Sequence, residues 1–164
     1  MSLPFPFEKA QTIKLILSDV DGVLTDGTLY YDPLGNKTKG FNTLDGFGIR
    51  AWLKAGFLFG IVTGRDDPCV ALRTKDLHIE IYHAGIKDKK NTVERIAQEY
   101  SIPLEQIAFI GDDLPDLPAM QICGLSIAVP DAVDEVKRVA DYVTQRRGGF
   151  GAVREVIDEM MRQA

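Results

Sequence analysis

The chain has 164 residues, 45% of them hydrophobic and 26% charged, which is typical of a globular protein with a substantial core. Its formal net charge of −5 favours neither nucleic acid nor an anionic membrane as a partner, and no apolar run approaches the ~18 residues that span a bilayer. Residues 1–11 do not match a signal peptide, and Cys69 and Cys123 lack metal-type spacing, so we expect one cytoplasmic domain over residues 1–164.

Short apolar runs alternate with helix-like segments along the chain. Strands are expected at residues 14–18, 57–62, 79–82, 107–110, 126–128 and 142–144. Helices are expected at residues 45–55, 67–77, 89–100, 115–122, 131–139 and 152–161. This alternation predicts an α/β fold, a Rossmann-like parallel sheet flanked by helices on both faces.

One segment breaks the alternation directly after the first strand. Residues 28–31 and 37–41 flank the turn-forming sequence Asp-Pro-Leu-Gly-Asn, which predicts a β-hairpin over residues 28–41. The intervals from Asp21 to Thr63 and from Lys89 to Gly111 are too short to hold a further inserted domain as well. We therefore expect any site at this end of the sheet to be open in an isolated subunit.

Two carboxylates, Asp19 and Asp21, follow the first strand, and Gly22 allows a sharp turn behind them. In an open α/β sheet this position faces the crevice where ligands bind. Two acids there repel each other unless a cation or a shared proton holds them, which indicates a divalent metal or acid/base chemistry. A strand that ends in a polar turn is the structural alternative.

Further polar groups follow the later strands. Thr63 follows residues 57–62, Lys89 comes after residues 79–82, and Asp112 follows residues 107–110. Because the carboxyl ends of parallel strands meet at one edge, these groups should lie together. Together these residues could supply what phosphoryl transfer requires: a nucleophile, an acid, two groups that bind phosphate oxygens, and a ligand for a metal.

These motifs resemble those of the haloacid dehalogenase superfamily of phosphatases. The resemblance rests on D-V-D-G-V-L-T-D-G at residues 19–27, V-T-G-R at 62–65, the lysine, and G-D-D-L-P-D at 111–116. Residues 41–49, 140–144 and 148–155 are similar to those of the capless 3-deoxy-D-manno-octulosonate (KDO) 8-phosphate phosphatases. Relatives that act on nine-carbon, sialic-type sugar-acid 9-phosphates have similar motifs, so these remain an alternative substrate.

The resemblance implies a role for each motif. Asp19 would be the nucleophile that forms an aspartyl-phosphate, and Asp21 the general acid and base. Mg²⁺ would be held by the side chains of Asp19 and Asp112 and by the backbone carbonyl of Asp21. Thr63 would bind a phosphoryl oxygen, and the spacing from Gly85 favours Lys89 over Lys87 and Lys90 as the catalytic lysine.

Supporting roles are expected for other residues. Asp113 would orient the lysine or a metal-bound water, and Asp116 would act in the same way or cap the helix at Pro115. A site for an anionic sugar-acid phosphate also needs residues that bind the sugar, arginines that bind the substrate carboxylate, and a glycine that keeps the turn after Thr63 tight. The candidates are Asn42, Thr43, Asp45, Gly64, Arg65 and Arg73.

The resemblance also implies a homotetramer in which hairpins pack together and roof neighbouring sites. The flexible Gly-rich tail at residues 145–151, with Arg146 and Arg147, would help to close a site. A receiver-like phosphoacceptor domain is a non-enzymatic alternative, since it also uses acids, Thr, Lys and Mg²⁺. Receiver domains, however, place the paired acids before a phosphorylated Asp on a later strand, which differs from the order here.

Overall fold

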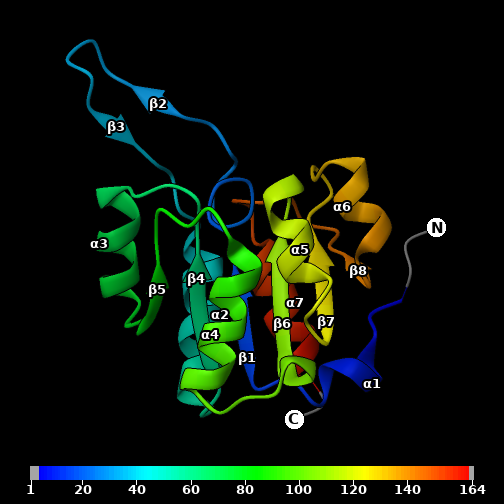
Figure 1. Cartoon of the computed structure of the whole chain (residues 1–164). Coiled ribbons are helices and arrows are strands. Elements are labelled where there is room, and N and C mark those ends of the chain that lie inside the picture. The colour runs from blue at the N-terminus through cyan, green and yellow to red at the C-terminus, as the bar shows by residue number, and fades with distance from the viewer. Residues whose placement is uncertain (1–3, 163–164) are drawn as a thin grey trace.

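A computed structural model describes residues 4–162, so residues 1–3 of the expected N-terminal segment lie outside the described part. Six strands form one sheet in which all paired neighbours are parallel. Their order is β5 (Ile81–His83), β4 (Leu58–Val62), β1 (Leu15–Ser18), β6 (Ile107–Gly111), β7 (Leu125–Ala128) and β8 (Tyr142–Val143). The α/β architecture predicted from the sequence is confirmed (Figure 1).

Strand β1 lies at the centre of the sheet, and all four of its residues are buried. A parallel strand covered on both faces reads as a continuous apolar run, which explains Leu-Ile-Leu at residues 15–17. Ser18 is level with Ile61 of β4 and Ile110 of β6. The carboxyl ends of these three neighbouring strands therefore lie at the same level of the sheet.

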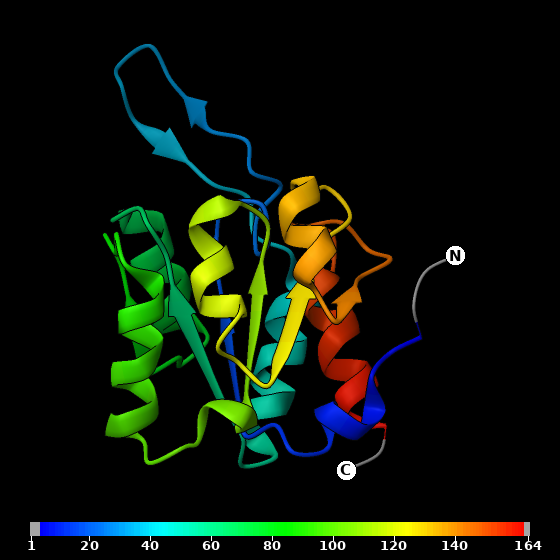
Figure 2. The same ribbon diagram turned by 45° about the vertical axis from the view of Figure 1, so that its right-hand side comes forward.

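Helices cover both faces of the sheet (Figures 1 and 2). Helices α2 (Thr43–Lys54) and α7 (Ala152–Met161) pack together on one face, while α4 (Lys89–Glu99) and α5 (Leu117–Met120) pack on the other. The remaining elements are α1 (Phe7–Ala10), α3 (Pro68–Asp76), α6 (Asp134–Val139) and the 3₁₀ turns η1 (Leu104–Gln106) and η2 (Leu114–Asp116). Asn42, Asp67 and Asp88 cap α2, α3 and α4 with their side chains.

Two expected helices differ from the structure. The helix expected at residues 115–122 is divided into η2 and α5, because Pro118 lacks the N–H that would bond to the carbonyl of Leu114 in a continuous helix. The helix expected at residues 131–139 begins only at Asp134. The backbone N–H of Val133 donates instead to the carbonyl of Asp112, which ties this turn to the end of β6.

The expected hairpin is present, and its paired strands are very short. Strands β2 (Tyr30–Tyr31) and β3 (Lys37–Thr38) are antiparallel, and Asp32 Oδ1 holds the turn by accepting from the N–H groups of Leu34 and Asn36. The hairpin projects beyond the carboxyl ends of the strands, away from the helices (Figure 2). Within residues 4–162, no helix is long and apolar enough to cross a membrane.

Candidate active site

The predicted catalytic residues meet at one edge of the sheet. Asp19, Thr63 and Asp112 directly follow β1, β4 and β6, and Lys89 is the first residue of α4. Strand β1 lies between β4 and β6, where the strand order reverses, and ligands bind at this point of an open α/β sheet. The fold thus gathers groups that are widely separated in the sequence.

Lys89 links Asp19 to Asp116. Its Nζ lies 3.0 Å from Asp19 Oδ2 and 2.6 Å from Asp116 Oδ1, whereas Lys87 and Lys90 are exposed. Burial acts to lower the pKa of Lys89, but the charges of Asp19 and Asp116 outweigh it and raise this pKa. Lys89 is therefore a cation held against the nucleophile candidate.

Asp19 itself is 8% exposed, and the N–H of Val20 donates to its Oδ1 at 2.7 Å. Burial and then the charge of Asp116 raise the pKa of Asp19 to about 6, although Lys89 acts in the opposite direction. Each oxygen of Asp19 therefore has one hydrogen-bond donor, which fixes the carboxylate in the crevice.

Asp112 has a buried oxygen, Oδ1, without a hydrogen-bond partner. Burial, and then the charges of Asp19, Asp116 and Asp113, raise the pKa of Asp112 to about 8. Gly22 makes this crowding possible, because a Cβ at position 22 would overlap Asp112 Oδ2 and because the φ of Gly22 is +89°. A partly buried carboxylate with a buried oxygen that has no hydrogen-bond partner is the arrangement expected of a metal ligand.

The acidic cluster fits Mg²⁺. Oxygen atoms of Asp19, Asp112 and Asp116 lie within 4.8 Å of one another. Asp116 is 0% exposed, and its two oxygens already accept from three donors, which are Lys89 and the N–H groups of Asp112 and Asp113. Asp19 has one donor on each oxygen and is partly open to the crevice, and Asp112 has a free oxygen. Asp19 and Asp112 are therefore the side chains best placed to hold a hard cation, which would neutralise their mutual repulsion.

Asp21 has a partner that sequence reasoning missed. Lys39, directly after β3, donates a hydrogen bond to Asp21 Oδ1, and Arg65 Nε lies 3.5 Å from Asp21 Oδ2. Lys37 and Lys39 are two residues apart, and residues with this spacing in an extended strand are expected on the same face. The sequence pattern therefore offered no signal to separate them. Only the way in which the base of the hairpin packs against the β1 loop distinguishes Lys39.

Other expected contacts differ in detail. Asp113 Oδ1 accepts from the N–H of Leu114 and caps η2, so Asp116, and not Asp113, orients the lysine. Thr63 is buried at the end of β4, while Gly64 and Arg65 are exposed in the following loop. Asp116 combines the two roles considered for it, because it belongs to the capping box of η2 and holds Lys89.

The residues expected to bind the sugar lie around the start of α2. Asn42 caps this helix and its Nδ2 donates to the carbonyl of Gly149, while Thr43 is exposed. Asp45 is buried, which raises its pKa, and its Oδ1 accepts from the N–H of Arg154. Arg73 Nη2 donates to the carbonyl of Asn42 at 3.3 Å. These contacts join α2 to α3 and α7, and a role in sugar binding stays a prediction.

The Gly-rich tail packs against the loop that follows β1. The N–H of Gly149 donates to the carbonyl of Val23 at 2.9 Å, and a Cβ at position 148 would overlap the carbonyl oxygen of Gly22. The tail therefore touches the catalytic loop of its own chain. Arg146 lies against Gly151, and Arg147 Nε pairs with Asp131 Oδ2 at 2.5 Å.

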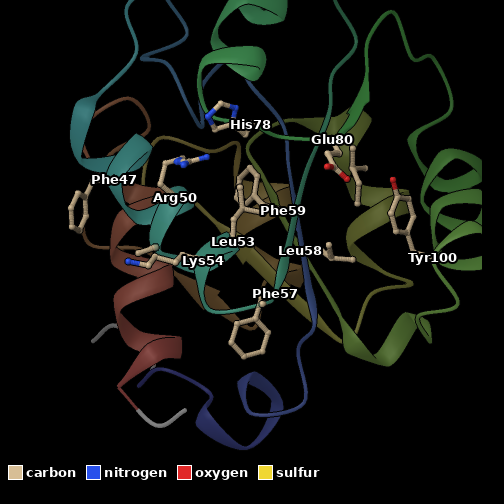
Figure 3. A pocket seen from close by; sticks show the side chains of 13 residues that line it. Phe47, Arg50, Leu53, Lys54, Phe57, Leu58, Phe59, His78, Glu80 and Tyr100 are labelled. Atoms are coloured by element: carbon tan, nitrogen blue, oxygen red, sulfur yellow. The ribbon is translucent and has the colours of Figure 1, made fainter.

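A separate hollow of about 840 Å³ lies at the opposite, amino-terminal end of the strands (Figure 3). Its lining residues, shown in Figure 3, include the apolar Leu53, Phe57 and Phe59 and the polar Arg50, His78 and Glu80. None of the predicted catalytic or metal-binding residues lines it. The chemistry is therefore assigned to the carboxyl edge, where the charged groups converge.

Comparison with known proteins identifies the class to which the chain belongs. The family model of haloacid dehalogenase-like hydrolases matches residues 67–157, more than half of the chain. The fold and the site thus define a haloacid dehalogenase-like hydrolase. The resemblance seen in the sequence motifs is confirmed.

Individual relatives identify a particular family within this class of hydrolases. The chain is 40% identical to the KDO 8-phosphate phosphatase KdsC of Haemophilus influenzae over 155 residues, covering 94% of this chain and 86% of that protein. KdsC of Escherichia coli K12 is 42% identical over 153 residues, covering 93% of this chain and 81% of that protein. The chain therefore belongs to the family of 3-deoxy-D-manno-octulosonate 8-phosphate phosphatases.

Solved structures agree with this placement. The phosphatase of Moraxella catarrhalis, in complex with magnesium, phosphate and KDO, matches with a TM-score of 0.93 and 40% identity, covering 95% of this chain and 90% of that chain. The cobalt-bound phosphatase of Haemophilus influenzae matches with a TM-score of 0.90 and 40% identity, covering 94% and 90%. Both relatives hold a divalent metal, as the carboxylates here are arranged to do.

Proposed function

We propose that this chain is a Mg²⁺-dependent phosphatase that hydrolyses KDO 8-phosphate to KDO and phosphate. The observation that carries the proposal is the convergence of Asp19, Lys89 and Asp112 at the carboxyl edge of β1. The substrate is inferred from relatives that are 40–42% identical and that bear this activity in their names.

The reaction would proceed in two displacements. An oxygen of Asp19 attacks phosphorus, the bond from phosphorus to the sugar oxygen breaks, and its electron pair leaves on that oxygen. Asp21 donates a proton to this oxygen, which is otherwise a poor leaving group. Water then attacks the aspartyl-phosphate, Asp21 takes a proton from the water, and the carboxylate of Asp19 is regenerated as phosphate leaves.

The cations of the site suit this chemistry. Lys89 and Thr63 would bind phosphoryl oxygens, and Mg²⁺, when bound to Asp19, Asp112 and the carbonyl of Asp21, would supply positive charge for the transferred group. Arg65 is exposed beside Asp21 and is placed to meet the anionic sugar acid. Gly64, Asn42, Thr43, Asp45, Arg73, Arg146 and Arg147 remain candidates for binding or shaping the sugar pocket.

The proposal is tested by phosphate release from a panel of substrates. We expect the highest kcat/KM with KDO 8-phosphate, lower values with nine-carbon sugar-acid 9-phosphates, and the lowest with simple sugar phosphates. Asp19→Asn should abolish turnover because an amide cannot form the acyl phosphate. EDTA should eliminate activity and Mg²⁺ restore it. Preference for a nine-carbon substrate would replace the proposed substrate, and a fully active Asp19→Asn variant would overturn the mechanism.

We also propose a cytoplasmic homotetramer. The hairpin exposes Tyr30, Tyr31 and Leu34, and a short hairpin is marginally stable by itself in water, so contacts between hairpins would cover apolar surface. Cys69 and Cys123 are free thiols, which suits a reducing compartment. Light scattering should give four times the chain mass, and Tyr31→Asp combined with Leu34→Asp should lower it. Val139→Asp, which replaces an exposed side chain on α6, serves as the control.

A further inference from the structure

Lys39 is a lysine whose side chain is almost completely buried, with 2% of its surface exposed. Lysine is seldom buried at all unless it is paired. Here its Nζ donates to Asp21 Oδ1 and lies 3.9 Å from Asp67 Oδ2, the residue that caps α3. The base of the hairpin, the loop after β1 and the start of α3 therefore meet at one ammonium group.

The two oxygens of Asp21 lie in different surroundings. Oδ1 bonds to the buried Lys39, whereas Oδ2 faces Arg65, whose side chain is 57% exposed. Interactions away from solvent are stronger and less screened than those at the surface. Lys39 therefore fixes the orientation of the carboxylate, and the oxygen beside the exposed Arg65 stays available to a ligand.

We propose that Lys39 is a positioning residue for Asp21, delivered to the catalytic centre of its own chain by the hairpin. The inference rests on the proposed function, in which Asp21 passes a proton to the sugar oxygen as the bond to phosphorus breaks. Proton transfer needs the two heavy atoms within about 2.6–3.2 Å, and a carboxylate free to rotate spends less time at that distance. The hairpin thus contributes a functional side chain, that of Lys39, to the catalytic centre.

The choice of leaving group separates this role from a general structural one. A sugar alkoxide needs a proton as it leaves, whereas p-nitrophenolate is stable without one. Lys39→Met should therefore lower kcat/KM for KDO 8-phosphate by ~10–100-fold, the cost of displacing a catalytic group by about 1 Å. The same variant should change kcat/KM for p-nitrophenyl phosphate by less than about threefold, because kcat/KM covers only the steps up to release of the leaving group. The later hydrolysis of the aspartyl-phosphate, in which Asp21 takes part with either substrate, does not enter kcat/KM.

Three variants serve as controls. Lys39→Arg keeps a cation at the end of a long side chain and should restore part of the lost activity. Lys37→Met removes the same charge from an exposed position on β3 and should leave both substrates unaffected. In an Asp21→Asn background, Lys39→Met should add less than about a twofold loss, because a residue that acts through Asp21 has nothing left to position.

Failure of the role proposed for Lys39 can be distinguished from failure of the proposed function. Equal losses on both substrates, full activity of Lys39→Met on KDO 8-phosphate, or an undiminished further loss in the Asp21→Asn background would each overturn the role of Lys39. If the wild type hydrolyses another alkyl phosphate and not KDO 8-phosphate, the proposed substrate is wrong. The effect of Lys39→Met on that ester, compared with its effect on p-nitrophenyl phosphate, then decides the role of Lys39. A wild type that hydrolyses no phosphate ester overturns both.

Discussion

Lys89 and Asp116 form an ion pair of 2.6 Å in which the two side chains are 2% and 1% exposed. The second oxygen of Asp116 accepts from the N–H groups of Asp112 and Asp113 at 3.0 and 3.2 Å. One buried carboxylate therefore orients both the lysine that faces Asp19 and the loop that carries Asp112. The catalytic groups depend on Asp116 although it has no free oxygen for a ligand.

Replacing Asp116 by Ala should destabilise the protein strongly. The change leaves Asp19 as the remaining partner of the buried Lys89 ammonium and deprives two N–H groups of their acceptor, and breaking a buried pair in this way costs about 3–5 kcal/mol. The free energy of unfolding from urea denaturation measures the effect. Asp113→Ala, which removes an exposed cap of η2, should cost only about 1 kcal/mol. Equal effects of the two changes would contradict the central role of Asp116.

Gly22→Ala should damage the metal site. Its φ of +89° is unfavourable for any residue with a Cβ, and the new methyl group would overlap Asp112 Oδ2. Asp112 must then move, so we expect Mg²⁺ to bind at least ~10-fold more weakly, in keeping with the cost of disturbing the surroundings of a metal ligand. Isothermal titration with Mg²⁺ measures the affinity. Gly35→Ala, at a positive φ in the hairpin turn with open space around it, is the matched control.

The fold and the main carboxylates could be predicted because they depend on local patterns. Alternating apolar runs and capping residues fix the strands and helices, and parallel strands bring Asp19, Thr63 and Asp112 to one edge. Such features need only sequence spacing and the rules of sheet geometry. The motif order then identified the family, which the comparisons confirmed.

Contacts across elements could not be predicted in this way. The pairing of Lys39 with Asp21 depends on how the hairpin folds back, and the pairing of Lys89 with Asp116 depends on a 3₁₀ turn that Pro118 separates from α5. The buried position of Asp45 beside the start of α7 depends on how α2 and α7 pack. Each is a tertiary contact between residues that are far apart in the chain.

Changing both Arg146 and Arg147 to Ala tests whether the Gly-rich tail takes part in substrate binding. We expect a higher KM for KDO 8-phosphate and an unchanged KM for p-nitrophenyl phosphate, because only the former carries a carboxylate for arginine to bind. Stability should change little, since the pair of Arg147 with Asp131 is exposed. Asp131→Ala removes the same ion pair without removing a cation, so it separates the two effects. Unchanged KM for both substrates would exclude the tail from substrate binding.

The metal-free protein should lose stability as the pH rises from 5 to 8. Burial and neighbouring carboxylates raise the pKa of Asp112 to about 8 and that of Asp19 to about 6, whereas both groups titrate near pH ~3.9 in an unfolded chain. Over this interval the folded protein binds more protons than the unfolded chain, so each rise in pH favours unfolding. In EDTA, the Tm should therefore be higher at pH 5 than at pH 8.

Mg²⁺ should oppose this loss, because it binds the ionised carboxylates and only in the folded state. We expect saturating Mg²⁺ to raise the Tm more at pH 8 than at pH 5, and to release protons when it binds near neutral pH. Asp112→Asn removes the group with the higher pKa, so it should flatten the profile in EDTA and abolish most of the gain from Mg²⁺. Thermal unfolding of both proteins at each pH, with and without Mg²⁺, measures these effects. A metal-free wild type that is more stable at pH 8 than at pH 5 would show that Asp19 and Asp112 are not held protonated by the fold.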